Sequence, residues 1–181
     1  MALLEARLRP LERLGRELAR RGKRVFGGID LSPAPGKDAS VGAAIEGLTG
    51  RPFGDASTLA ACAAITDALK RVRVKRCGYS GLMLPVLEDP VLARRASEGR
   101  YSVRELLLYS SVCGTGLDVV PLPGDAAPER LAALVGDMAA LAVKLGKPLS
   151  ARLFPVPGKA PGDLAHFDDP YLTDCVVMKV E

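Results

Sequence analysis

The chain has 181 residues, a formal net charge of +4 and a hydrophobic fraction of 48%. Disordered chains combine low hydrophobicity with high net charge, so this composition excludes disorder and predicts one globular domain with a hydrophobic core. No apolar run approaches the roughly 18 residues of a membrane-spanning helix, and residues 1–23 lack the apolar centre of a signal peptide. We therefore expect a cytoplasmic protein that does not enter a membrane.

Three residue types are absent from the sequence: Asn, Gln and Trp. Asn and Gln are depleted in proteins from hyperthermophiles, so their absence predicts a thermophilic source, with codon bias toward Arg as the alternative. The single histidine, His166, excludes a histidine-rich metal site. The cysteines lie too far apart for a CxxC motif, and in an ordinary cytosol we expect them to be reduced thiols. Intracellular proteins of hyperthermophiles do contain disulfides, so one disulfide is the alternative if the source is a hyperthermophile. These cysteines are Cys62, Cys77, Cys113 and Cys175.

The first expected element is an amphipathic helix within residues 1–22, since leucines recur at helical spacing over residues 3–21. Pro10 either kinks this helix or marks its true start. Residues 1–24 carry eight basic and three acidic side chains, a net charge of +5, so the rest of the chain sums to −1. Aromatic residues are only 4%, and acidic and basic residues pair at i,i+4, so we expect a solvated helix face and no nucleic-acid partner.

Short apolar segments then alternate with helices. Residues 24–31 predict a strand that enters a rigid, proline-rich loop at 32–36, and residues 41–48 and 57–70 predict two helices. Residues 79–87 predict a strand or a strand-like buried segment. Asp89 is a candidate N-cap, followed by Pro90 in the first turn of the next helix.

The second half continues the same alternation. Ser102 and Glu105 form a capping box that opens a helix to about residue 112. A glycine-rich turn then leads into a strand at residues 119–120, and a long helix from residue 128 ends at Gly146. Two further strands are expected, over residues 149–156 and 175–180. The alternation predicts a single α/β domain over residues 1–181, with mostly parallel strands and packed helices.

The most distinctive local segment is residues 110–118, SSVCGTGLD. Gly114 and Gly116 leave backbone N–H groups free for an anion, and Asp118 is expected at the start of a strand. Cys113 is accordingly a candidate nucleophile or redox thiol, with Asp118 and Asp30 as candidate acids, bases or ligands. The alternative is a glycine cap beside a small buried residue, because a helix C-terminus does not activate a thiol.

Residues 147–159 offer two candidate anion ligands. Arg152 has apolar neighbours, and a buried arginine usually pairs with a carboxylate or an anionic ligand. Lys147 follows Gly146, where it either binds an anion or complements the helix end. Carboxylates at several turns could hold a hard cation, but no spacing matches a known metal-binding loop. The sequence therefore indicates no particular metal or cofactor.

Five blocks of the sequence, in order, resemble one family, the domain of unknown function 711 family, also called uncharacterised protein family 0210. The blocks are GGIDLSPAPG at 27–36, the VGAAIE run ending at residue 46, GYSGLMLPVLED at 78–89, LLLYSSVCGTGLDVVPLPGD at 106–125 and KPLSARLFPVPGK at 147–159. The resemblance implies part of a ten-stranded α/β barrel like that of glycyl-radical enzymes. Family chains are longer, and these blocks belong to their C-terminal portion, so the chain looks like a partial member.

Two functions from different classes follow as expectations. The first is an enzyme-like barrel portion that binds a small, anionic molecule near Asp30, Cys113, Asp118 and Arg152. The second is a non-catalytic subunit that pairs with itself or with a partner chain supplying the missing N-terminal portion, with the leucines of residues 3–21 as the interface.

Overall fold

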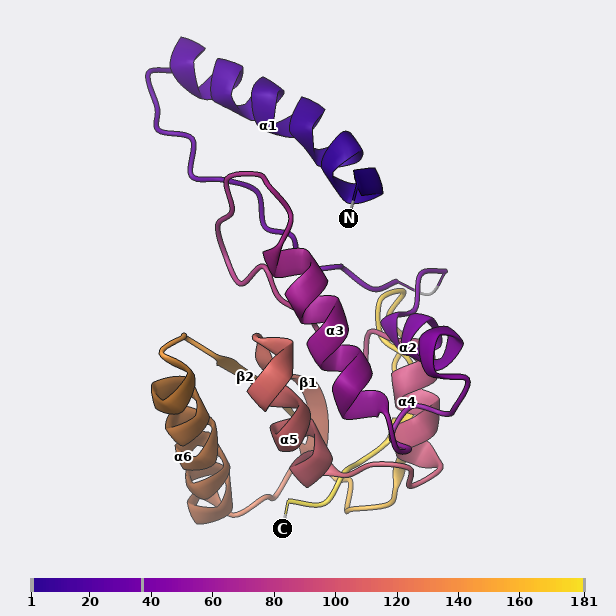
Figure 1. Cartoon of the computed structure of the whole chain (residues 1–181). Coiled ribbons are helices and arrows are strands. Elements are labelled where there is room, and N and C mark those ends of the chain that lie inside the picture. Colours follow the sequence, from indigo (N-terminus) through magenta and orange to yellow (C-terminus); the bar gives the residue numbers. More distant parts are fainter. Residues whose placement is uncertain (1, 37, 181) are drawn as a thin grey trace.

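The computed structural model of the chain describes residues 2–36 and 38–180. The helices within them are α1 (Ala2–Arg21), α2 (Val41–Thr49), α3 (Thr58–Lys70), α4 (Pro90–Ser97), α5 (Val103–Cys113) and α6 (Pro128–Leu145). The strands are β1 (Gly116–Pro123), β2 (Ser150–Val156), β3 (Leu164–Ala165) and β4 (Cys175–Val176). Figure 1 shows α1 standing off from the body of the molecule, which holds the other elements.

The body is built around β1, whose eight residues are all buried. On one side β1 pairs in parallel with β2. On the other it accepts backbone hydrogen bonds from Val86 and Leu87, at the end of the segment 82–87, which does not form a regular strand. β3 and β4 form a separate antiparallel pair. The continuous apolar run of β1 agrees with a strand that is covered on both faces.

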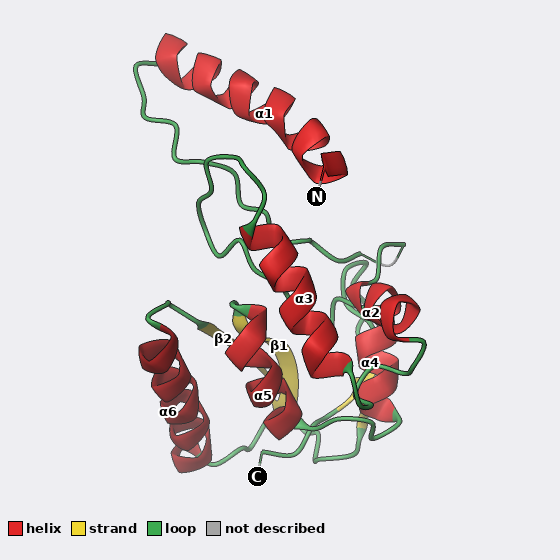
Figure 2. Ribbon diagram, viewed as in Figure 1, coloured by secondary structure: helices red, strands yellow, loops and turns green. Residues whose placement is uncertain are grey.

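Two helices lie against the β1–β2 sheet, α5 on β1 and α6 on β2, and α3 packs on α5 (Figure 2). α2 and α4 pack together at the side of the body. The core includes Phe53, which is fully buried and makes edge-to-face contacts with Tyr101 and Tyr109, with ring centroids 5.1 and 5.5 Å apart. Apolar burial on this scale is what holds a small α/β body together.

The barrel expectation is wrong. Among the described residues the only parallel sheet has two strands, β1 and β2, and it does not close. Residues 24–31, expected as a strand, contribute only the bridge of Ile29 with Arg76, whereas residues 79–87 form the strand-like buried segment that was the alternative to a strand, with a bridge of Pro85 to Asp118. Pro85 removes a ladder donor and the positive φ angles at Gly78 and Ser80 turn the chain before residues 82–87, while the φ of 137° at Gly28 interrupts residues 24–31, so neither segment continues as a regular strand. The molecule is a mixed α/β structure with a small parallel sheet.

Local signals predicted the helices better than the strands. The Asp89 N-cap and the Ser102–Glu105 capping box are both present, as is the glycine that ends α6. Asp89 is fully buried and also accepts hydrogen bonds from Ser40 and Gly42, so it joins the starts of α2 and α4. The strand expected over residues 175–180 is only the two-residue β4.

A bulge interrupts the pairing of β1 with β2. Leu117 lies opposite Ala151, but the next regular partner pair is Val120 with Leu153, so β1 carries one extra residue. Val119 within this bulge has a φ of 43°, a left-handed conformation that a β-branched side chain rarely adopts. The bulge lies directly after Asp118, opposite Arg152.

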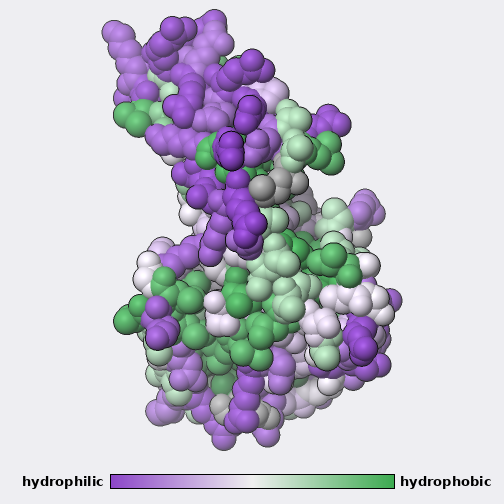
Figure 3. Space-filling model, viewed as in Figure 1, coloured by the Kyte–Doolittle hydropathy of each residue, from purple (hydrophilic) through white to green (hydrophobic). Residues whose placement is uncertain are grey.

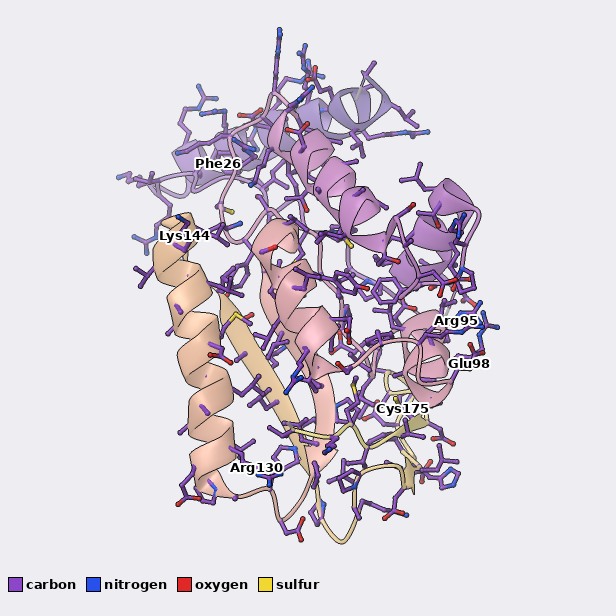
Figure 4. The ribbon with its side chains drawn as sticks, turned by 60° about the horizontal axis from the view of Figure 1, so that its bottom comes forward. Phe26, Arg95, Glu98, Arg130, Lys144 and Cys175 are labelled. Atoms are coloured by element: carbon purple, nitrogen blue, oxygen red, sulfur yellow. The ribbon has the colours of Figure 1, made fainter. Side chains whose placement is uncertain are left out.

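The neck, residues 28–32 and 75–80, connects α1 to the body. Its two segments exchange backbone hydrogen bonds, from Ile29 to Lys75 and from Cys77 to Ile29. α1 rests on the neck through Glu12, which accepts a hydrogen bond from the backbone of Lys75, and on the segment just before the neck through Glu5, which accepts one from the backbone of Arg73. Phe26, labelled in Figure 4, lies beneath α1 with the Arg16 guanidinium 5.4 Å from its ring centroid. Pro10 lies inside α1 rather than at its start.

Candidate functional site

The turn at residues 77–80 is organised by Asp30. Its carboxylate accepts hydrogen bonds from the backbone N–H groups of Tyr79 and Ser80, and from the backbone N–H and hydroxyl of Ser32. Burial opposes the charged form, but these hydrogen bonds outweigh it and lower the pKa of Asp30. A side chain at Gly78 would begin 2.1 Å from a carboxylate oxygen of Asp30, so the turn requires glycine.

Three cationic side chains meet at this turn. A cavity of about 330 Å³, which we call the basic pocket, is lined by Lys70, Arg76, Cys77, Gly78, Tyr79, Ser80 and Lys147. The Lys147 ammonium donates a hydrogen bond of 2.7 Å to the Tyr79 carbonyl, and Arg76 donates one to the Lys70 carbonyl. The lining includes no carboxylate. The basic pocket therefore concentrates positive charge.

The local charges act on Lys147 itself. Burial lowers the pKa of its ammonium, and repulsion from Lys70 and Arg76 lowers it further, against the attraction of Asp30. Gly114 ends α5 in a left-handed conformation, and a side chain there would begin 3.0 Å from the Lys147 nitrogen. Glycine at 114 thus leaves room for the lysine.

The two other residues of the glycine-rich turn serve packing. A side chain at Gly116 would begin 2.1 Å from the Ser150 carbonyl oxygen, so glycine lets β1 approach β2. Cys113 is fully buried, with its sulfur 3.4 Å from the Thr115 hydroxyl. The nearby Cys62 is also buried, and burial together with Cys113 raises its pKa to about 12. All four cysteines are free thiols.

A second polar cluster lies on the bulge. The Arg152 guanidinium bonds the Asp118 carboxylate and lies 3.3 Å from Glu88. The Asp118 side chain is only 3% exposed, and its second oxygen, Oδ2, has no hydrogen-bond partner within the described chain. The hydrogen bond to Asp118 raises the pKa of Arg152. This arrangement places a buried carboxylate beside the strained Val119.

The predicted site residues thus form two groups. Asp30, Cys113, Gly114 and Lys147 gather around the neck and the end of α5, whereas Asp118 and Arg152 pair with each other farther along β1 and β2. Only Lys147 of the predicted residues lines the basic pocket. Sequence reasoning missed Lys70, Arg76 and Tyr79, although the basic run of residues 70–76 directly precedes the Gly78 turn.

Two classes of site are not found in residues 2–36 and 38–180. No group of three or more His, Cys, Asp or Glu side chains is arranged to hold a metal ion. No helix in the same residues is both long and apolar enough to cross a membrane.

Comparison with known proteins identifies relatives for most of the chain. The UPF0210 protein of Pyrobaculum arsenaticum is 42% identical over 158 residues, which cover 84% of this chain and 35% of the relative. That of Syntrophobacter fumaroxidans is 40% identical over 175 residues, which cover 93% of this chain and 38% of the relative. The chain therefore spans little more than a third of the length of these curated relatives.

A family model agrees with these relatives. The model described as "Uncharacterised ACR (DUF711)" matches residues 6–168, which include most of α1, the neck, the basic pocket and the bulge. The chain belongs to the DUF711 family, whose curated members carry the name UPF0210.

Proposed function

We propose that the chain binds a small anion, a phosphate or a carboxylate, in the basic pocket. The observation that carries this proposal is the convergence of Lys70, Arg76 and Lys147 on a cavity whose lining contains no carboxylate. Oxyanions are bound in proteins by such charge-assisted hydrogen bonds. A bound anion would also relieve the repulsion that lowers the pKa of Lys147.

The competing role for these cations is structural. α3 and α6 end close to the pocket, and basic side chains stabilise helix C-termini. Arg76 and Lys147 each hold a backbone carbonyl, of Lys70 and Tyr79 respectively. Neither hydrogen bond uses all the donors of its side chain, because an ammonium has three N–H donors and a guanidinium has five. Further donors are therefore available to a ligand while the carbonyls stay bonded.

The proposal is binding and includes no chemical step. The Cys113 thiol is fully buried, which argues against its use as a nucleophile. The oxygens of Asp30 accept hydrogen bonds that shape the neck. Arg152 faces Asp118 and Glu88, so we place the anion at Lys147 and not at Arg152.

Calorimetric titration with inorganic phosphate, and separately with acetate, tests the proposal. We expect saturable binding to the wild-type chain that weakens as salt increases. Lys147→Met should weaken it at least about tenfold, equivalent to 1.4 kcal/mol, and Lys70→Met by a smaller factor. Lys159→Met is the matched control, because Lys159 lies beyond the opposite end of β2 and does not line the basic pocket.

The control variant should bind like the wild type. If Lys147→Met lowers the free energy of unfolding but leaves phosphate affinity unchanged, the cations serve only the helix ends and the proposal is wrong. An equal loss in Lys147→Met and Lys159→Met would contradict it too, because that result would assign the affinity to overall charge.

A further inference from the structure

α1 presents an apolar face that the rest of the chain does not cover. None of its described residues is buried, and the exposed fractions of its outward leucines range from 40% to 71%. We call these residues the leucine face: Leu3, Leu4, Leu11, Leu14 and Leu18. Exposing a row of leucines costs hydrophobic free energy, so the face is suited to a partner.

A different edge of α1 contacts the neck and the segment just before it. Glu5 and Glu12 accept backbone hydrogen bonds there, Leu8 packs on the small cluster around Leu69, and Phe26 lies against Gly15. These contacts fix the orientation of α1. They leave the leucine face exposed.

A groove lies between α5 and α6 in the body. Its volume is about 410 Å³, and its lining is mostly apolar: Leu107, Leu108, Ser111, Asp137, Ala140 and Leu141. Leu108 is 52% exposed. Figure 3 shows apolar residues gathered on this side of the body, whereas the side of α1 seen in the same view is mostly polar.

We propose that α1 of a second copy of this chain occupies the α5–α6 groove with its leucine face inward. The two surfaces match in kind, an apolar helix face and an apolar groove, and helices are commonly recognised this way through anchors spaced along one face. The inference goes beyond anion binding and uses none of the residues of the basic pocket.

Charge supports the choice of a second copy as the occupant. α1 carries six arginines and three glutamates, a net charge of +3. Arg7 lies on the leucine face, three residues after Leu4 and four before Leu11, and Arg21 lies three after Leu18. Asp137 is the only charged residue in the lining of the groove, and its charge is opposite. The helix offered by a second copy thus complements the groove in charge as well as in polarity.

The proposed contact forms twice between the same two copies. Each copy carries one helix and one groove, so a pair in which each α1 enters the groove of the other copy fills both surfaces. This reciprocal arrangement has twofold symmetry and two identical contacts, whereas a one-way contact would extend into an open chain. The pair should therefore stop at two copies.

Light scattering after size-exclusion chromatography, together with sedimentation, tests the assembly. The wild-type chain should have the mass of two copies. Leu14→Glu on α1 and Leu108→Glu in the groove should each reduce the mass to one copy, because both bury a charge at the contact. Ala2→Glu and Ala139→Glu add the same charge on the opposite faces of α1 and α6 and should stay dimeric. Circular dichroism checks the fold; Leu11→Glu replaces Leu14→Glu, and Leu141→Glu replaces Leu108→Glu, if either variant unfolds.

A mixing experiment identifies which surfaces touch. Leu14→Glu retains an intact groove and Leu108→Glu an intact α1, so an equimolar mixture should recover pairs that contain one of each. A monomeric wild-type chain would overturn the proposal. So would a dimer that Leu14→Glu disrupts and Leu108→Glu leaves intact, because the leucine faces would then contact each other. The mixed pair keeps one of the two contacts, so it should associate more weakly than the wild type; a mixture that associates no more than either variant alone, at the highest concentration measured, would also contradict the proposal.

Discussion

The α1 arm and the body differ in how they use similar apolar patterns. β1 buries all eight of its residues between β2, residues 82–87 and α5, whereas no described residue of α1 is buried. α1 keeps its contacts with the neck and the segment just before it through two glutamates and Leu8, and its remaining leucines face outward. Hydrophobic spacing therefore predicts the type of an element, but not whether the same chain covers it.

The largest expected difference between these regions is in core truncation. Phe53→Ala empties the space between Tyr101 and Tyr109 and should lower the free energy of unfolding by about 3–5 kcal/mol. Leu18→Ala on α1 removes a side chain that is 57% exposed and should change it by less than about 0.5 kcal/mol. Urea titration under conditions that keep the chain monomeric measures both. Equal losses would contradict the division into a packed body and an uncovered arm.

This contrast also separates what the sequence predicts from what it does not. Helix boundaries follow from local chemistry, as Asp89, Ser102 and Gly146 demonstrate, because a cap acts on backbone groups within a few residues. The closed barrel was wrong because strand pairing depends on distant segments. Residues 79–87 have the composition of a strand, yet the turn at Gly78 and Ser80 and the proline at 85 reduce their pairing to a bridge.

The candidate site was predicted in part for the same reason. Lys147 and Gly114 were identified from the residues that end α6 and α5, and the structure brings them together. Lys70 and Arg76 were missed because their positions depend on how the end of α3 meets the neck. The bond between Asp118 and Arg152 required knowing that β1 and β2 are parallel neighbours with a bulge at this point.

The neck joins the two regions, and its geometry can be tested at Gly78. Gly78 has a φ of 60°, and a side chain there would collide with Asp30. Gly99 in the body has a φ of 69°, with open space around it. Gly78→Ala and Gly99→Ala should both lose about 1–2 kcal/mol from backbone conformation, and Gly78→Ala should lose about 1–2 kcal/mol more from the collision. Thermal unfolding of the two variants gives the difference; equal losses would mean that the neck yields to the added carbon.

A smaller difference is expected between ion pairs of the body and the arm. Arg95 on α4 is 16% exposed and bonds both Glu46 and Glu98, as Figure 4 shows for Glu98, whereas Arg21 on α1 is 70% exposed and bonds Glu17. Arg95→Met should lower the free energy of unfolding by about 1–2 kcal/mol, between the values for exposed and buried pairs. Arg21→Met should change it by less than about 0.5 kcal/mol. Chemical denaturation at low and high salt measures both, and similar values would remove this distinction between body and arm.

The smallest expected effect is the acid sensitivity of the neck. Hydrogen bonds from Ser32, Ser80 and Tyr79 outweigh burial and hold the pKa of Asp30 below its ordinary value of 3.8. Because the folded chain binds this proton less readily than the unfolded chain, the carboxylate stabilises the fold above pH 3.8, and that contribution is lost as the pH falls through the lower pKa. Asp30→Asn should therefore flatten the fall in stability below this pH, as followed by circular dichroism.

Asp38→Asn, which removes an exposed carboxylate nearby, should keep the wild-type slope. An unchanged slope in Asp30→Asn would mean that the neck is not held by this charge, and the rigid connection between arm and body would need another source.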